Sequence, residues 1–240
     1  MIHLHLPEGL YSCFSDLSHS SEVLFETEKN IATAYEPKRL MEFCSGRYCA
    51  HLSLKKLGVD APILKTEEGA PLWPKGITGS ISHSTQTAGS IVASTDRIQS
   101  IGLDIETMGR ISPDMWSILF TPNEINMLMH SKPAEIDFLS TLLFSMKESF
   151  YKMQFPISQH FMDFQDCEVT YSNEKCHIQP HVSLSAPLNN PAQYDIKFLR
   201  LETEIITYII LHRPDSSFRH DKPKHQVYNH PRKPYRHERQ

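Results

Sequence analysis

The amino-acid sequence predicts an α+β fold, because a helix followed by several strands occurs in each half of the chain. Apolar residues recur at helical spacing over residues 37–58 and again over residues 135–154. Each stretch is followed by short strand-like runs that can pair as an antiparallel sheet. The repeated order also suggests two similar lobes with a cleft between them.

In the first half, a helix is predicted from Pro37 to Gly58. Proline suits the first helical turn and glycine suits the position after the last. Residues 60–76 have the glycines and prolines of a loop. Three strands are then predicted, over residues 77–82, 88–94 and 100–106.

In the second half, the run from Thr121 to Glu124 is typical of a capping box, which predicts a short helix to about His130. A long helix follows from Glu135 to about Gln154. Four strands complete the folded part, over residues 167–172, 177–183, 194–201 and 204–212. We therefore expect an N-terminal lobe over residues 1–115 and a C-terminal lobe over residues 116–212.

Composition indicates a soluble, cytoplasmic protein. The chain has 240 residues, 40% of them hydrophobic, which is enough to bury a core. No apolar run approaches the roughly 18 residues of a membrane span, and the start lacks the features of a signal peptide. The five cysteines form no Cys-x-x-Cys pair, so neither a disulfide framework nor a zinc ribbon is indicated.

The net charge of −4 hides a basic C-terminal segment. Residues 213–240 contain eight Lys or Arg against three Asp or Glu, with many Pro and His and few aliphatic residues. Such a composition predicts a mostly disordered tail. A solvated extension is favoured over an arm that binds nucleic acid or an acidic protein.

Two carboxylates two residues apart are the sharpest feature of the sequence. If residues 100–106 form a strand, Asp104 and Glu106 point to the same face. Two neighbouring carboxylates repel each other unless they share a cation, and oxygen ligands favour Mg²⁺ or Mn²⁺. A solvated acidic strand face would give the same pattern.

A second candidate group lies on the long helix. Glu148 and Lys152 are four residues apart and share one helix face, and Lys147 is adjacent. A carboxylate with two nearby cations suits a site that handles phosphate. An ordinary surface ion pair would have the same spacing.

Further candidates for phosphate binding precede these residues. Ser82 and His83 lie at the end of the first predicted strand and offer a hydroxyl and an imidazole. Arg39 and Arg47 are eight residues apart on the first helix, about 80° apart around its axis, so both can reach one phosphate-bearing ligand. Solvated helix arginines are the alternative.

Taken in order, these segments resemble the 4′-phosphopantetheinyl transferases of the Sfp type, and most closely the enterobactin-synthase branch called EntD. The resemblance covers roughly residues 35–212 and has two small departures: Ala70 stands where some members have a lysine, and Phe144 where many have a tryptophan. The matching segments are Lys38–Arg47, Gly69–Pro74, Gly79–His83, Ile101–Glu106, Phe120–Glu124 and Phe144–Lys152.

The resemblance implies a pseudo-symmetric monomer that binds coenzyme A between its lobes. It would transfer the phosphopantetheine arm to a serine of an apo acyl, peptidyl or aryl carrier protein. Asp104, Glu106 and Glu148 would surround Mg²⁺, and Glu148 or a metal-bound water would accept the serine proton.

The same resemblance implies how coenzyme A is held. Lys152 would contact the transferring phosphate, and Ser82 and His83 would hold coenzyme A phosphates. Lys147 is also predicted to bind coenzyme A. Arg39 and Arg47 would hold the 3′-phosphate and adenine end. Siderophore peptide synthesis is the favoured pathway.

Two other functions fit parts of the pattern. A metal-dependent phosphodiesterase or nuclease would use Asp104, Glu106 and Glu148, with the basic tail on nucleic acid, although nucleic acid is not the favoured partner. A non-catalytic scaffold would leave the acidic strand face merely solvated. Release of adenosine bisphosphate from coenzyme A would separate the first from the transferase.

Overall fold

The computed structural model describes residues 2–184 and 186–213. The disorder predicted for the C-terminal tail therefore falls, apart from Arg213, outside the described residues. Within the described part, no helix is long and apolar enough to cross a membrane.

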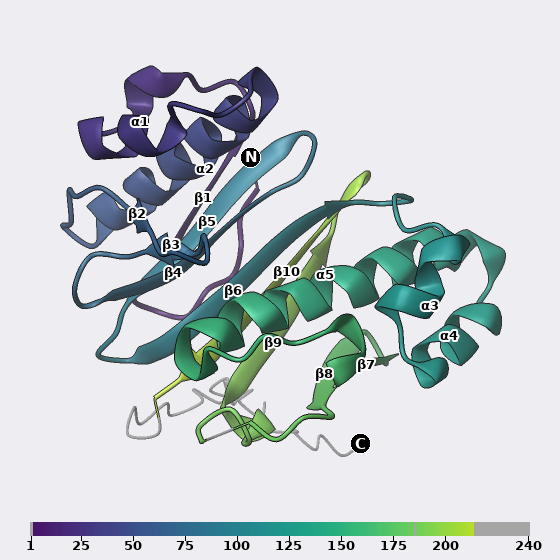
Figure 1. The fold of residues 1–240 in the computed structure, drawn as a ribbon. Coiled ribbons are helices and arrows are strands. Elements are labelled where there is room, and N and C mark those ends of the chain that lie inside the picture. Colours follow the sequence, from purple (N-terminus) through teal and green to yellow (C-terminus); the bar gives the residue numbers. More distant parts are fainter. Residues whose placement is uncertain (1, 185, 214–240) are drawn as a thin grey trace, which may run out of the picture.

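A three-stranded antiparallel sheet and one long helix form the first half of the molecule (Figure 1). The predicted helix is α2 (Pro37–Lys56), which packs its buried Ala50 and Leu54 against Val92 of the sheet. The strands, in spatial order, are β1 (Leu10–Asp16), β5 (Thr87–Ser94) and β4 (Ile77–His83). A short helix, α1 (Glu26–Ala32), and a ribbon of β2 (Leu64–Lys65) and β3 (Pro71–Leu72) complete this half.

The second half repeats this plan. The long helix α5 (Pro133–Ser158) covers a sheet whose strands, in spatial order, are β6 (Ile98–Thr107), β10 (Glu204–His212) and β9 (Tyr194–Arg200). The smaller elements are α3 (Trp116–Leu119), α4 (Pro122–Met129) and the hairpin of β7 (Cys167–Ser172) and β8 (Lys175–Pro180). The predicted α+β class, with a helix on an antiparallel sheet in each half, is confirmed.

Strand β6 does not pair where the sequence order suggested. It was grouped with the N-terminal lobe, but it is hydrogen-bonded to β10 over nearly its whole length, from Thr107 opposite Glu204 to Ile101 opposite Ile210. The two sheets therefore divide the chain between β5 and β6, earlier than the expected boundary at residue 115. Hydrophobic pattern identifies a strand but not its partner, which explains the difference.

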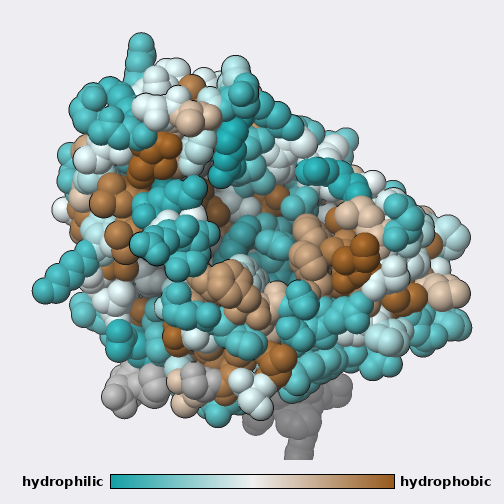
Figure 2. Space-filling model, viewed as in Figure 1, coloured by the Kyte–Doolittle hydropathy of each residue, from teal (hydrophilic) through white to brown (hydrophobic). Residues whose placement is uncertain are grey.

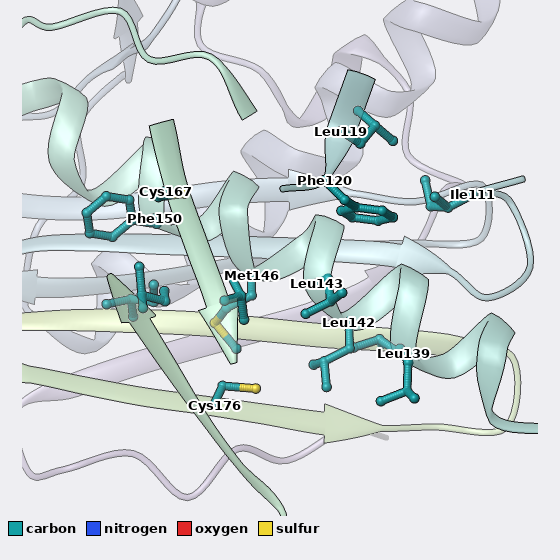
Figure 3. Close-up of a cluster of buried hydrophobic side chains, with 14 of the residues drawn as sticks. Ile111, Leu119, Phe120, Leu139, Leu142, Leu143, Met146, Phe150, Cys167 and Cys176 are labelled. Carbon is teal, nitrogen blue, oxygen red and sulfur yellow. The ribbon is translucent and has the colours of Figure 1, made fainter. Parts of the chain in front are cut away.

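Besides the packing of α2 on Val92, two larger hydrophobic clusters stabilise the fold. One lies beneath α5, where Leu142, Leu143 and Met146 pack on α3 and the β7–β8 hairpin (Figure 3). The other lies between the two sheets and includes Ile91 from β5 and Leu103 from β6. The helices are thus outside and the sheets inside.

The edges of β4 and β6 meet without a strand ladder. Ser80 Oγ accepts the N–H of Leu103 at 3.0 Å, and Ser82 Oγ accepts the N–H of Ile105 at 3.3 Å. We call these two contacts the serine seam. Because of the seam, the polar face of β6 lies beside the end of β4, which positions the candidate site.

Helix α5 approaches β6 very closely at Gly102. A Cβ atom built there would lie 1.8 Å from the carbonyl oxygen of Ser149. Only glycine allows the helix to lie this low, and the close packing brings the polar side chains of α5 to the level of those on β6.

Candidate active site

A cleft of about 420 Å³ lies between the two halves and is lined by side chains from α2, β4, β6 and α5. Figure 2 shows a hydrophilic hollow near the middle of this face, with hydrophobic side chains on either side. All but one of the predicted site residues line the cleft, namely Arg39, Arg47, Ser82, His83, Asp104, Glu106, Glu148 and Lys152.

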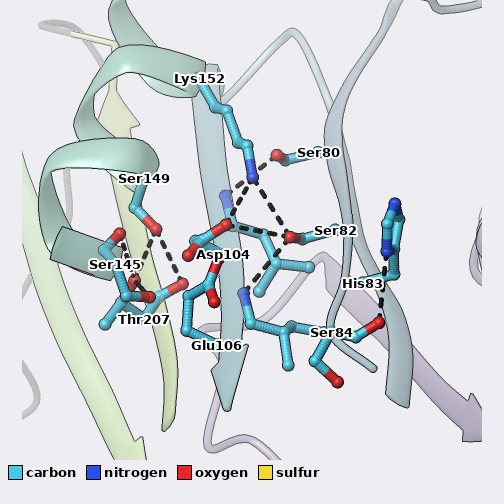
Figure 4. Close-up of polar contacts among 12 residues, drawn as sticks. Ser80, Ser82, His83, Ser84, Asp104, Glu106, Ser145, Ser149, Lys152 and Thr207 are labelled. Carbon is cyan, nitrogen blue, oxygen red and sulfur yellow. Dashed lines mark hydrogen bonds and ion pairs between the residues drawn. The ribbon is translucent and has the colours of Figure 1, made fainter. Parts of the chain in front are cut away.

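At the floor of the cleft, three polar side chains from three elements meet (Figure 4). Lys152 Nζ, on α5, lies 2.6 Å from Asp104 Oδ1, on β6, and 3.2 Å from Ser82 Oγ, on β4. Ser82 Oγ also donates to Asp104 Oδ1 at 3.1 Å. Because the Ser82 hydroxyl already has three protein partners, it organises Lys152 and Asp104 before any ligand arrives.

The carboxylates beside Lys152 are short of positive charge. Asp104 is buried, and its Oδ2 atom has no hydrogen-bond partner in the described part of the chain. Burial and the neighbouring Asp104 raise the pKa of Glu106 to about 7. Burial, and again Asp104, also raise the pKa of Glu148. This surplus of negative charge suits a ligand that brings a cation.

The three carboxylates are not drawn together around a point. Within residues 2–184 and 186–213, no three His, Cys, Asp or Glu side chains are grouped as ligands of one metal ion. Instead, the Lys152 ammonium occupies one oxygen of Asp104. The predicted metal-binding residues thus share the cleft, with a protein cation beside them.

In the absence of divalent cations, the raised pKa of Glu106 predicts how the free energy of unfolding changes with pH. A carboxyl whose folded-state pKa exceeds its unfolded value, here 4.5, stabilises the fold below that value and loses this contribution as pH rises through about 7. Glu106→Gln should therefore be nearly neutral at pH 4 and stabilise by on the order of 1–3 kcal/mol at pH 8. Urea unfolding of both proteins in EDTA tests this; a mutant destabilised at pH 8 would contradict it.

The outer part of the cleft carries further cations. Arg39 Nη1 lies 2.9 Å from His83 Nε2 and 3.3 Å from Glu42 Oε2. Burial lowers the pKa of His83, so its ring is neutral near pH 7 and can accept the arginine N–H. Arg39 and His83 thus act as one polar unit at the rim.

Arg47 is the most buried of the cleft cations. Its guanidinium lies over the ring of Phe43, 4.6 Å from the centroid, and Nη2 donates to the carbonyl of Leu64 at 3.3 Å. Burial lowers its pKa to about 10, so it stays charged at neutral pH. A buried, fixed guanidinium is well suited to a phosphate.

Comparison with known proteins gives this arrangement a family. Residues 26–93 match the model of the 4′-phosphopantetheinyl transferase N-terminal domain, and residues 100–196 match that of the 4′-phosphopantetheinyl transferase superfamily. The chain is 32% identical over 178 residues to the 4′-phosphopantetheinyl transferase Npt of Nocardia iowensis, covering 72% of this chain and 78% of that protein. The chain belongs to the 4′-phosphopantetheinyl transferase superfamily.

Other members of the superfamily match over shorter stretches. The transferase PptT of Mycobacterium tuberculosis is 33% identical over 57% of this chain, and the chain spans 60% of that protein's length. Enterobactin synthase component D of Salmonella typhi is 29% identical over 56% of this chain and 56% of that protein. The resemblance drawn from the sequence motifs, the enterobactin-synthase branch included, is confirmed.

Lys147 does not line the cleft. This residue was predicted to bind the cofactor, but its side chain points away from the cleft and is 1% exposed. Its Nζ atom lies 2.7 Å from Glu124 and donates to the carbonyls of Leu119 and Phe164. Adjacent helix positions differ by 100°, so the helix that turns Glu148 into the cleft turns Lys147 into the core.

The sequence motifs of the superfamily did not reveal every cleft residue. Lys65 lines the cleft and has no carboxylate partner in the described part of the chain, and Tyr35 lies beside it. Lys65 stands opposite Pro71 in the β2–β3 ribbon, next to Ala70, where some transferases have a lysine. The sequence predicts a loop over residues 60–76, because a two-stranded ribbon this short has no periodicity to detect.

Proposed function

We propose that this chain transfers the 4′-phosphopantetheine group of coenzyme A to a serine of an apo carrier protein, releasing adenosine 3′,5′-bisphosphate. The observation that supports this most is that a single cleft is lined by Asp104, Glu106 and Glu148 from β6 and α5 and by Arg39 and Arg47 from α2. That distribution matches a ligand with a pyrophosphate at one end and a further phosphate at the other.

In the proposed reaction, the serine oxygen attacks the phosphorus next to the pantetheine arm. A new P–O bond forms to the serine, and the bond to the bridging pyrophosphate oxygen breaks, leaving that oxygen on adenosine 3′,5′-bisphosphate. Glu148 accepts the serine proton, since burial raises the pKa of its carboxyl and makes it a better base. Lys152 stabilises the charge that develops on the phosphoryl oxygens.

Mg²⁺ or Mn²⁺ is part of the proposal. The donor set consists of carboxylate oxygens alone, and Asp104 Oδ2 is buried with no partner among residues 2–184 and 186–213, which fits a hard divalent cation. Asp104, Glu106 and Glu148 would hold it. Such an ion would neutralise pyrophosphate charge that the excess of acidic residues otherwise repels.

The setting of the reaction is also proposed. A cytoplasmic monomer would suit a donor made inside cells, and the five cysteines are free thiols. The carrier is proposed to belong to a siderophore peptide synthetase, which rests on the likeness to enterobactin synthase component D.

The direct test is incubation with a fluorescent coenzyme A analogue and a panel of apo carrier proteins. We expect a covalently labelled carrier only when a divalent cation is present, with the label lost when the carrier serine is replaced by alanine. Hydrolysis of DNA or of simple phosphodiesters, with no labelled carrier, would instead support the phosphodiesterase alternative.

The two arginines should act on donor binding more than on the chemical step. Their contacts to the 3′-phosphate would persist from ground state to transition state, so Arg39→Ala and Arg47→Ala should raise KM and leave kcat nearly unchanged. We expect about a tenfold to hundredfold loss of affinity for coenzyme A. The same substitutions should reduce the affinity for dephospho-coenzyme A, which lacks the 3′-phosphate, far less. Arginine variants that keep the full wild-type preference for coenzyme A would contradict this assignment.

A further inference from the structure

A buried carboxylate lies directly behind the cationic wall of the cleft. Glu28, on α1, has no exposed surface and is not among the predicted site residues. Its Oε2 atom accepts the N–H of Phe25 at 3.0 Å. Its Oε1 atom accepts the N–H of Ile63 at 2.9 Å and the Nε2–H of His51 at 2.9 Å. A single side chain thus joins α1, α2 and the segment that leads into β2.

Arg47 belongs to the same arrangement. Its Nε atom lies 3.6 Å from Glu28 Oε1 and has no hydrogen-bond partner in the part of the chain that the structure describes. The Leu64 carbonyl accepts a hydrogen bond from Nη2 of Arg47, and the N–H of the preceding residue, Ile63, donates to Glu28. The carboxylate therefore holds the guanidinium both by its charge and by fixing the carbonyl beside it.

The charge of Glu28 is well supported. Burial opposes ionisation of Glu28, but the bonds from His51 and from the backbone of Ile63 and Phe25 outweigh it and lower its pKa. Burial likewise opposes the charge on Arg47, and Glu28 is the main group that favours it. Without this carboxylate, the guanidinium would be a buried charge with no carboxylate partner, and it would turn toward solvent.

The other half of the molecule contains a counterpart that serves as a reference. Glu124, on α4, accepts the backbone N–H groups of Thr121 and Val169, both at 2.7 Å, and pairs with Lys147 of the long helix at 2.7 Å. Here both charged side chains are 1% exposed, and neither lines the cleft. The same type of carboxylate is thus purely structural in one half, whereas in the other it also holds a cation that faces the cleft.

We propose that Glu28 is a positioning residue for donor recognition. It fixes the orientation in which Arg47 receives the 3′-phosphate of the donor. Through Ile63 it also fixes the segment that carries Lys65. This inference rests on the proposed function of the cleft.

The test compares Glu28→Gln with Glu124→Gln. An amide has one acceptor oxygen in place of two and carries no charge, so each substitution weakens its own helix cap and ion pair in the same way. For each full-length protein, KM and kcat are measured with coenzyme A and with dephospho-coenzyme A. Binding of adenosine 3′,5′-bisphosphate is measured separately by calorimetry, which needs no carrier.

We expect Glu28→Gln to raise KM for coenzyme A about tenfold, with kcat within about twofold and little change for dephospho-coenzyme A. Calorimetry should show a similar loss for adenosine 3′,5′-bisphosphate. Glu124→Gln should lower the melting temperature comparably but keep the wild-type preference between the donors. If Glu28→Gln does not fold, Glu28→Asp is used instead, which keeps the charge but places the carboxylate farther from Arg47. It should lower the preference for coenzyme A over dephospho-coenzyme A at least about threefold.

Two results with the variants would overturn the inference. One is a folded Glu28 variant that keeps the full preference for coenzyme A. The other is an equal loss of preference in Glu124→Gln, which would make the effect a general consequence of instability. A wild-type protein without any preference would remove the phosphate-binding role of Arg47 and the inference with it, whereas carrier labelling tests the transferase activity independently.

Discussion

Replacing Asp104 by asparagine should reduce the transfer rate by more than about a hundredfold while the fold is retained. The substitution preserves shape but removes the charge that faces Lys152 at 2.6 Å, and it removes the unpartnered oxygen that we assign to the metal. Glu148→Gln should have a loss of similar size, because it removes both a proposed metal ligand and the proposed base. Steady-state transfer of fluorescent phosphopantetheine to an apo carrier, at saturating Mg²⁺, measures both.

Glu42→Gln is a suitable control for the Asp104 result. Glu42 also lines the cleft, but its carboxylate contacts Arg39, at 3.3 Å, and His83, at 3.6 Å. It should change the rate only several-fold. If Asp104→Asn and Glu148→Gln both keep near-wild-type rates, these carboxylates do not form the catalytic centre.

Gly102→Ala should destabilise the protein by more than about 3 kcal/mol or prevent folding. Its new methyl group would lie 1.8 Å from Ser149 O, 2.8 Å from Ser149 C and 2.9 Å from Met153 N. These are backbone atoms of α5, so the clash is relieved only if the whole helix moves. Any protein that folds should also lose activity, since α5 carries Glu148 and Lys152.

Gly46→Ala provides the matched comparison on the other long helix. Its methyl group would meet Ile81 Cγ2 at 2.9 Å, the end of a side chain that can turn aside. We expect a cost of about 1 kcal/mol, measured by urea unfolding. Equal effects of the two substitutions would show that α5 is not held against β6 in the way described.

Much of the site could be predicted from sequence because its residues lie on regular elements. Asp104 and Glu106 alternate with buried residues along β6, and Glu148 and Lys152 share one face of α5. Periodicity therefore placed each pair correctly. The order of the segments resembles the family, and this resemblance predicts that the two pairs share one site. The spacing within each pair could not predict that.

What sequence could not supply is the partner of each group across the fold. Lys147 is of a residue type that often binds phosphate, yet it pairs with Glu124, which lies in a different helix. Glu28 precedes the recognisable motifs and has no chemical signature until Ile63, His51 and Arg47 converge on it. Strand β6 likewise has no local feature that selects β10 over the strands that precede it.

The serine seam means that few backbone contacts join β4 to β6 beside the cleft. Two hydroxyl contacts, each contributing only about 1 kcal/mol, replace the continuous ladder that would otherwise join the inner edges of the two sheets. The proposed donor spans the same gap, with α2 holding one end and α5 the other. Coenzyme A bound there would add contacts between α2 and α5, and these contacts would be lost when adenosine bisphosphate leaves.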